Sequence, residues 1–152
     1  MDLSTLLRDR AEVVVNEALA ELCQARLAHY EADGYGTARQ RLSDLLDLTL
    51  RCIEEGRADP IVDYATRVGG ERFAAGYDLC EVQIAINVLE EVLWKRILSS
   101  VGPEELAHAL GLVNAILGMA KDTLARTYVS LATEQQPSPV DMRGFLRWAQ
   151  SG

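Results

Sequence analysis

Proline, cysteine and aromatic residues are all scarce in this sequence. It has four prolines and three cysteines in 152 residues, and aromatic residues make up only 6%. Few prolines leave long stretches open to helix formation, and an odd number of widely spaced cysteines argues against a disulfide framework or a metal site. We therefore expect a helical domain in which Cys23, Cys52 and Cys80 are buried free thiols.

Basic residues are also in the minority, with 15 lysines and arginines against 23 acidic residues and a net charge of −8. Phosphate binding needs clustered basic residues, so neither nucleic acid nor an anionic membrane is an expected partner. No apolar run approaches the roughly 20 residues of a membrane-spanning helix, and the N-terminus MDLSTLLRDR does not resemble a signal peptide. The expected location is the cytoplasm.

Histidine, the side chain most often used as a general base, occurs only at positions 29 and 108. Neither belongs to a nucleophile motif such as Gly-x-Ser-x-Gly, so we expect no enzyme activity. Glu105 and His108 have the spacing of di-iron ligands on a helix, but Arg26 stands where His29 would need a glutamate. Both histidines lie near predicted helix ends rather than in a core, so neither metal nor haem is expected, and the predicted cofactor is none.

Apolar residues recur at steps of three and four along most of the chain, a pattern typical of helices. The predicted class is all-α, with five or six helices packed as an antiparallel bundle or as a globin-like single domain. Helices are expected over residues 5–30, 37–55, 59–74, 79–98 and 103–132. The helical domain should cover residues 1–135, followed by a linker and a short helical tail at 136–152.

Several helix ends carry local signals. Asp78 and Glu81 form a capping box that should start a helix at residue 79, and Thr37 is an expected N-cap. The pair Gly69-Gly70 interrupts the third helix, where it predicts either a bend or a close helix crossing.

The first predicted helix has two apolar faces. One face holds the core positions, and a second row at steps of seven lies almost opposite, consisting of Leu6, Val13, Ala20 and Leu27. Because the core already uses the other face, we expect this row to form the seam of a homodimer.

The helix predicted at residues 79–98 carries an unusually polar row beside its apolar stripe, formed by Gln83, Asn87, Glu90 and Trp94. One interpretation is a boundary face with an amphipathic tryptophan. The other is a ligand-sensing pocket or a partner surface with hydrogen-bonded polar groups.

The same helix carries a family resemblance. Residues 72–97, RFAAGYDLCEVQIAINVLEEVLWKRI, resemble the N-terminal sensory domain of the RsbRD type, named after RsbT co-antagonist proteins of bacterial stress signalling and also found ahead of histidine kinases. The shared features are the approach Arg-Phe-x-x-Gly-Tyr-Asp-Leu-x-Glu-Val, the centre Asn-x-Leu-Glu-Glu and the exit Leu-Trp-x-x-Ile.

The resemblance implies a dimeric helical domain without obligatory haem that passes a signal to an output domain. No sulfate-transporter-anti-sigma-like or kinase sequence follows Gln135, so we expect either a free-standing sensor or an output on a partner. The expected function is a non-catalytic signalling module in stress or two-component-type regulation, acting on an unknown downstream protein. The alternative is a globin-like sensor that binds a small ligand or cofactor.

Overall fold

Six α-helices make up the part of the chain that the computed structural model describes, residues 2–25 and 34–135. They are α1 (Leu3–Asp9), α2 (Ala11–Ala25), α4 (Tyr35–Glu55), α5 (Asp59–Ala74), α6 (Leu79–Ser100) and α7 (Pro103–Gln135). No strand occurs in these two ranges. The predicted all-α class with five or six helices is confirmed, whereas the predicted tail at 136–152 lies outside the described residues.

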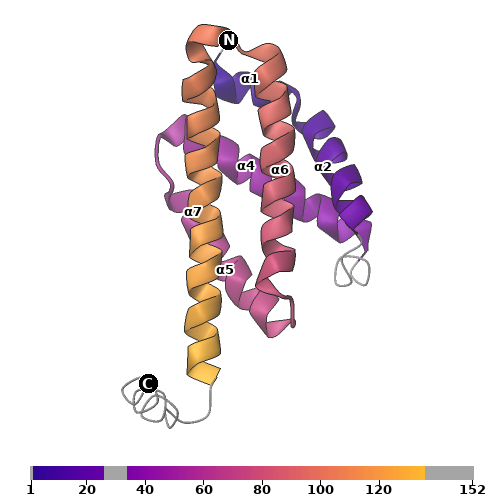
Figure 1. Ribbon diagram of the computed structural model, residues 1–152, viewed down its shortest axis with the longest axis vertical. Coiled ribbons are helices and arrows are strands. Elements are labelled where there is room, and N and C mark those ends of the chain that lie inside the picture. Colours follow the sequence, from indigo (N-terminus) through magenta and orange to yellow (C-terminus); the bar gives the residue numbers. More distant parts are fainter. Residues whose placement is uncertain (1, 26–33, 136–152) are drawn as a thin grey trace, which may run out of the picture.

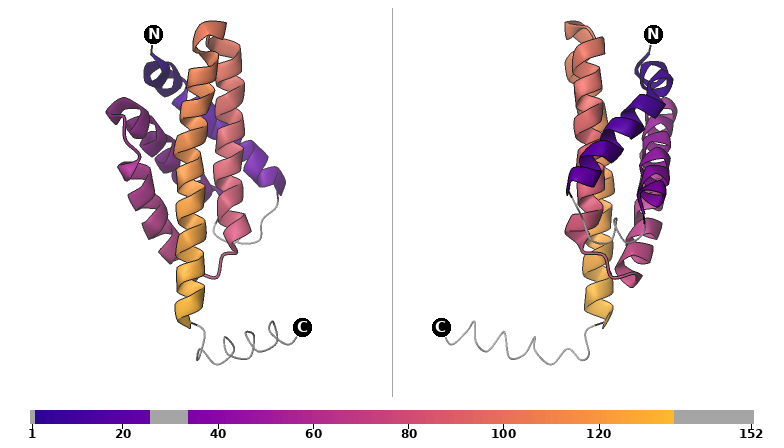
Figure 2. Two further views of the ribbon diagram at one scale, coloured as in Figure 1. Left: turned by 60° about the vertical axis from the view of Figure 1, so that its left-hand side comes forward. Right: turned by 90° about the vertical axis from the view of Figure 1, so that its right-hand side faces the viewer.

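The helices form two layers. α6 and α7 make an antiparallel hairpin, and α4 crosses obliquely behind both of them (Figure 1). α5 packs against α7, and α2 packs against α4 and α6. Because α2 and α4 are inclined to the hairpin (Figure 2), the helices do not all run side by side as in a simple antiparallel bundle.

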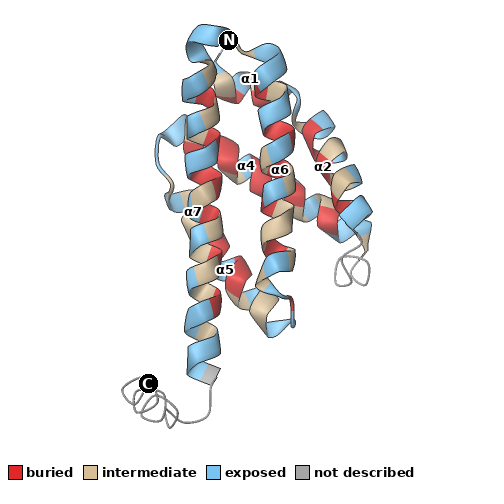
Figure 3. Cartoon of the chain, in the orientation of Figure 1, coloured by how far each residue is buried: buried red, intermediate tan, exposed pale blue. Residues whose placement is uncertain are grey.

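The core lies between the two layers (Figure 3). Every helix contributes buried residues to it, and α6 contributes a nearly complete stripe. The stripe consists of apolar residues at steps of three and four, as the periodicity predicts, and its buried members are Val82, Ile86, Leu89, Val92, Leu93 and Ile97. α7 likewise buries its predicted positions through the middle of the helix, including Val113, Leu117, Ala120 and Leu124.

The predicted start of α6 is confirmed. Its first residue is Leu79, and the side chains of Asp78 and Glu81 form the reciprocal capping box. Gly76 precedes the box with φ of 85°, a left-handed conformation that glycine adopts without a steric penalty. Thr37, in contrast, is not a cap, because α4 already starts at Tyr35 with Gly34 as its N-cap.

The prediction of one continuous first helix over residues 5–30 is wrong. The chain breaks at Arg10, whose backbone N–H donates to the carbonyl oxygens of Leu7 and Arg8 and closes α1. The guanidinium of Arg8 then reaches α4, 2.8 Å from Glu54 and 3.2 Å from Asp47. Helical periodicity could not reveal the break, because α1 and α2 both turn their apolar sides toward the same core. The apolar pattern therefore continues across Arg10.

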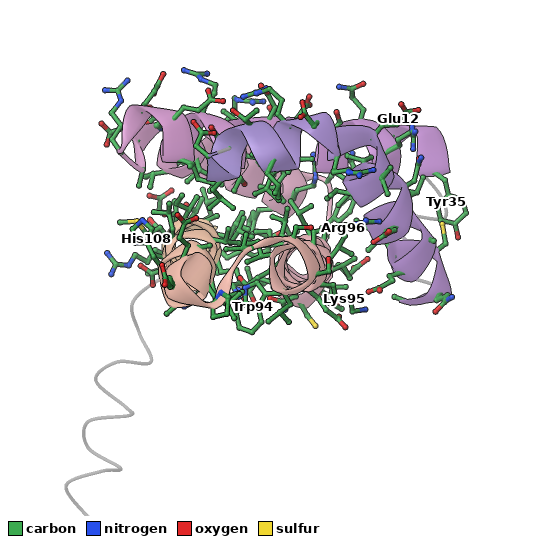
Figure 4. All side chains as sticks on the ribbon, turned by 90° about the horizontal axis from the view of Figure 1, so that it is seen from above. Glu12, Tyr35, Trp94, Lys95, Arg96 and His108 are labelled. Atoms are coloured by element: carbon green, nitrogen blue, oxygen red, sulfur yellow. The ribbon has the colours of Figure 1, made fainter. Side chains whose placement is uncertain are left out.

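Two ion pairs lie at the rim of the contact between α2 and α6. Lys95 Nζ lies 3.2 Å from Glu21 Oε1, and Arg96 pairs with Glu17. Figure 4 shows both basic side chains on the side of α6 that is nearest α2. Pairs this exposed stabilise a fold by at most about 1 kcal/mol, so apolar burial dominates this contact.

Gly69 marks the close crossing of α5 and α7. A Cβ atom at this position would lie 3.0 Å from Thr127 Cγ2 on α7, closer than side chains normally pack. α5 continues through the glycine pair without a break. Of the two alternatives predicted for Gly69-Gly70, the close crossing is therefore confirmed.

Candidate functional site

The predicted polar row of α6 lies beside α7, where it meets one lysine. Lys121 Nζ donates to Asn87 Oδ1 at 3.1 Å and lies 3.4 Å from Glu90 Oε2. Gln83 Nε2 donates to the backbone carbonyl oxygen of Lys121 at 3.4 Å. Trp94, the fourth member, lies on the side of the hairpin away from α2 and α4 (Figure 4). The structure thus brings three of the four predicted residues to one partner.

Glu90 is the one charged residue of this row, and its carboxylate is largely buried. The Glu90 side chain is 14% exposed and that of Lys121 is 28% exposed. Glu90 Oε2 is buried and accepts no hydrogen bond from the described residues, so the nearby ammonium group is its electrostatic compensation. Lys121 was not predicted as part of the site. It follows Ala120, a residue of the apolar stripe of α7, and helical periodicity assigns a role only to the stripe.

The row occupies the boundary of the α6–α7 contact. Gln83 and Glu90 are half-buried, whereas Asn87 is exposed and Trp94 is 38% exposed. This placement agrees with the boundary interpretation and leaves the outer edge accessible. A role for the row in sensing or partner contact stays a prediction.

The Asn87→Leu variant is expected to change the free energy of unfolding by less than about 1 kcal/mol, because surface hydrogen bonds contribute little. Lys121 keeps Glu90 as its partner in this variant. Urea denaturation followed by circular dichroism measures the change. Glu90→Leu serves as the contrast, since it leaves the half-buried Lys121 without its carboxylate. A loss above about 2 kcal/mol in Asn87→Leu would show that Asn87 is a structural polar group instead.

The predicted dimer seam is divided in the structure. Leu6 belongs to α1 and packs partly against the core, whereas Val13 and Ala20 are exposed on α2. Leu27 lies outside the described residues. The monomer therefore uses part of a row that was predicted to be free, and the role of Val13 and Ala20 in a dimer stays a prediction.

A partly open cavity of about 40 Å³ lies between the layers. Residues of α2, α4, α5, α6 and α7 line it, and most of them are apolar, including Leu42, Val68, Ile86 and Leu124. The exceptions are Arg41, Tyr64 and Arg72, but the wall as a whole is almost entirely apolar. No pattern along the sequence predicts this cavity, because its lining comes from five separate helices.

The guanidinium groups of Arg41 and Arg72 both contact Tyr77, which is only 5% exposed. The Cζ atoms of Arg41 and Arg72 lie 5.5 Å and 5.6 Å from the centroid of its ring, a cation–π distance. Arg41 Nη1 donates to the Tyr77 hydroxyl at 2.8 Å. The Tyr128 hydroxyl on α7 donates to the Tyr77 carbonyl oxygen at 2.9 Å. Tyr77 therefore connects α4 and α5 to α7.

Burial sets the pKa of two phenols near the cavity. Desolvation raises the pKa of Tyr64 above its usual value, and Asp44 adds to this effect while the neighbouring arginines oppose it. Desolvation also raises the pKa of Tyr128, chiefly because it packs in the core. Both hydroxyl groups therefore stay protonated and can donate hydrogen bonds at neutral pH.

The histidines and cysteines are the remaining residues that the sequence analysis considered as possible ligands or reactive groups. His108 lies exposed near the start of α7 (Figure 4), and His29 is outside the described residues. Within residues 2–25 and 34–135, no three histidine, cysteine or acidic side chains gather as a metal site would require. Cys52 is buried, which raises the pKa of its thiol. Cys23 is only partly buried and Cys80 is exposed, so the prediction of three buried thiols is confirmed for Cys52 alone.

No helix in the described part of the chain combines the length and the apolar character that crossing a bilayer requires. This result concerns the helices alone.

Comparison with known proteins identifies one family. The profile of the RsbT co-antagonist protein rsbRD N-terminal domain matches residues 11–137. A search of curated proteins and a search of solved structures each returned no match. The matched range includes α2, α4, α5, α6 and α7, which are the helices that line the cavity.

Proposed function

Because this chain belongs to the family of RsbT co-antagonist protein rsbRD N-terminal domains, we propose that it is a non-catalytic sensory module of bacterial stress signalling. The family is one of regulatory signalling domains, which supports a role in protein contact rather than in catalysis. In this proposal the domain acts in the cytoplasm, forms a homodimer and passes its signal to a downstream signalling protein. The same role in two-component-type regulation is a variant of this proposal.

The path of α7 is the observation that carries this proposal. Leu117, Ala120 and Leu124 are buried at the centre of the fold, whereas Val129 is 65% exposed one turn farther along. The end of the same helix extends beyond α5 and α6 (Figure 1). A helix transmits displacement as a rigid element, so a change in the core can reach a partner at its end.

The outer face of the α6–α7 hairpin is the proposed dimer surface. Four large apolar side chains are exposed on these two helices, with Trp94 at 38%, Leu98 at 56%, Met119 at 49% and Val129 at 65%. α2 offers one comparable side chain, Val13, at 38%. Apolar area that leaves water contributes about 25 cal/mol per Å², so the hairpin has more to gain from association than the originally predicted seam.

The variant with both Trp94→Glu and Leu98→Glu is expected to be monomeric, because it places two acids on an apolar contact in a protein whose net charge is already −8. Light scattering at several protein concentrations measures the mass, and circular dichroism checks that helicity is retained. Val13→Glu is the matched control on α2. If Val13→Glu dissociates the dimer and the double variant does not, the interface lies on the originally predicted row.

A second candidate function, sensing of a small ligand, is favoured by the cavity. Its wall includes Ala120 and Leu124 of α7, so an occupant would contact the helix that leaves the core. A ligand sensor and a protein-contact module are compatible, because the first describes the input and the second describes the output.

A further inference from the structure

We propose that an acidic groove at one end of the fold binds residues 142–149 of a second copy of this chain. This contact goes beyond the proposed sensory role, because it names a surface and a segment through which two copies recognise each other. The supporting features are the apolar floor of the groove, two free carboxylates at its rim, the sequence of the segment and the length of α7.

The groove lies where α1, the C-terminal end of α4 and the loop between α6 and α7 meet. Figure 4 looks onto this end of the molecule, with His108 at the edge of the groove. The volume of about 820 Å³ is typical of protein binding clefts. Five apolar side chains line the groove and are only half-buried, namely Leu3, Leu6, Ile53, Val101 and Leu112. An apolar partner that covers them removes this remaining surface from water, which favours association.

The rim of the groove is acidic. Asp2, Glu54, Glu104 and Glu105 line it, whereas no lysine or arginine of the described residues does. Asp2 is already engaged as the N-cap of α1, and Glu54 pairs with Arg8 at 2.8 Å. The exposed carboxylates of Glu104 and Glu105 have no such partner in the described part of the chain. Two negative charges therefore remain available to a basic segment.

Residues 142–149, MRGFLRWA, complement both parts of the groove. Their apolar residues include a set with the spacing i, i+3, i+4, i+7, by which amphipathic helices fill apolar grooves, namely Met142, Phe145, Leu146 and Ala149. Trp148 adds a large aromatic ring, and the segment contains no acidic residue. Arg143 and Arg147 supply two positive charges, and guanidinium groups form strong hydrogen bonds with carboxylates.

The length of α7 assigns the segment to another copy rather than to the same chain. Leu112 is the farthest residue along α7 that lines the groove, and α7 continues to Gln135 at the opposite end of the fold (Figure 1). At about 1.5 Å per residue, this part of α7 is roughly 35 Å long. Residues 136–141 span at most about 20 Å, so residues 142–149 cannot fill the groove of their own chain. Two copies related by a twofold axis instead exchange these residues and form two identical contacts.

The fluorescence of Trp148 tests the proposal. The chain contains two tryptophans, so Trp94→Phe leaves Trp148 as the single one and keeps an aromatic side chain at position 94. We call this variant the reporter chain. Its emission is expected to move to shorter wavelength as the protein concentration rises, because docking takes the indole ring out of water.

A groove variant, made by adding Glu104→Arg and Glu105→Arg to the reporter chain, is expected to weaken this transition roughly tenfold or more, since like charges then face each other. The matched control adds Glu12→Arg and Asp59→Arg instead. These two acids are exposed in the first turns of α2 and α5, outside the groove, so the control has the same net charge and the same loss of acids from helix starts. The control should keep the transition.

Mixing two chains distinguishes docking between copies from docking within one. The acceptor chain has an intact groove but no tryptophan and no basic segment, because it carries Trp148→Phe, Arg143→Glu and Arg147→Glu in addition to Trp94→Phe. The groove variant serves as the donor, since its segment is intact and its own groove is not. Addition of the acceptor should move the donor emission to shorter wavelength, although the donor alone shows no shift at that concentration.

Three results overturn the proposal. Emission that does not depend on concentration in the reporter chain leaves the groove to a different protein. A transition that the groove variant retains places the segment elsewhere, and a donor that ignores the acceptor excludes exchange between copies. If circular dichroism shows that the groove variant does not fold, the reporter chain with Arg143→Glu and Arg147→Glu tests the same contact without altering any described helix. This variant should lose the transition, and its retention overturns the proposal.

Discussion

Replacing Gly69 by leucine is expected to lower the free energy of unfolding by about 2–3 kcal/mol, the usual effect of forcing extra atoms into a packed contact. The physical reason is the crossing with α7. A Cβ atom alone would lie 3.0 Å from Thr127 Cγ2 and 3.4 Å from Leu124 Cδ2, so the remaining atoms of leucine must push the helices apart. Leu124 also lines the cavity, so the damage extends into the core.

Gly70 provides a matched control in the next position of the same helix. Apart from its chain neighbours and the backbone of its own helix, no described atom lies within 4 Å of the place where its Cβ would be. Leucine at Gly70 is expected to stabilise the helix by about 0.5–1 kcal/mol, because glycine is a poor helix former. Urea denaturation of both variants measures the difference. Equal stability of Gly69→Leu and Gly70→Leu would mean that α5 and α7 can separate without loss.

The Leu117→Ala variant is expected to lower the free energy of unfolding by about 2–5 kcal/mol, the range for a fully buried leucine. Leu117 is 0% exposed at the middle of α7, between the layers. Truncation removes apolar contacts and leaves a new void, which neighbouring side chains fill only in part. The loss appears in both thermal and urea denaturation.

Val129→Ala is the control on the same helix. Val129 is 65% exposed beyond the core, so its truncation should change the free energy of unfolding by no more than about 0.5 kcal/mol. A large loss there would show that the end of α7 is packed against something in solution, and a small loss in Leu117→Ala would contradict the core described for α7.

Local signals in the sequence were sufficient for the fold class and for several boundaries. The capping box of Asp78 and Glu81 and the proline at position 103 each depend on residues that are neighbours in sequence, so they could be predicted directly. The buried stripe of α6 depends only on helical periodicity. The break at Arg10 could not be found this way, because α1 and α2 turn their apolar sides toward one core on both sides of the break.

The candidate site was predicted only in part, for a physical reason. Gln83, Asn87 and Glu90 could be selected as a polar row from α6 alone, but their partner Lys121 is 31 or more residues away from each of them. The cavity depends on five helices at once, and Arg41 and Arg72 come from different helices to contact the ring of Tyr77. Contacts between distant segments leave no pattern along a single helix.

The contact of α2 with α6 also has a consequence for biosynthesis. Lys95 and Arg96 are 74 and 79 residues from their partners Glu21 and Glu17 on α2. At roughly 5–20 residues per second, a ribosome needs on the order of ten seconds to deliver α6 after α2 has emerged. During this interval α2 can pack against α4 but not against α6. The nascent chain therefore exposes the apolar area that α6 later covers until its second half is made.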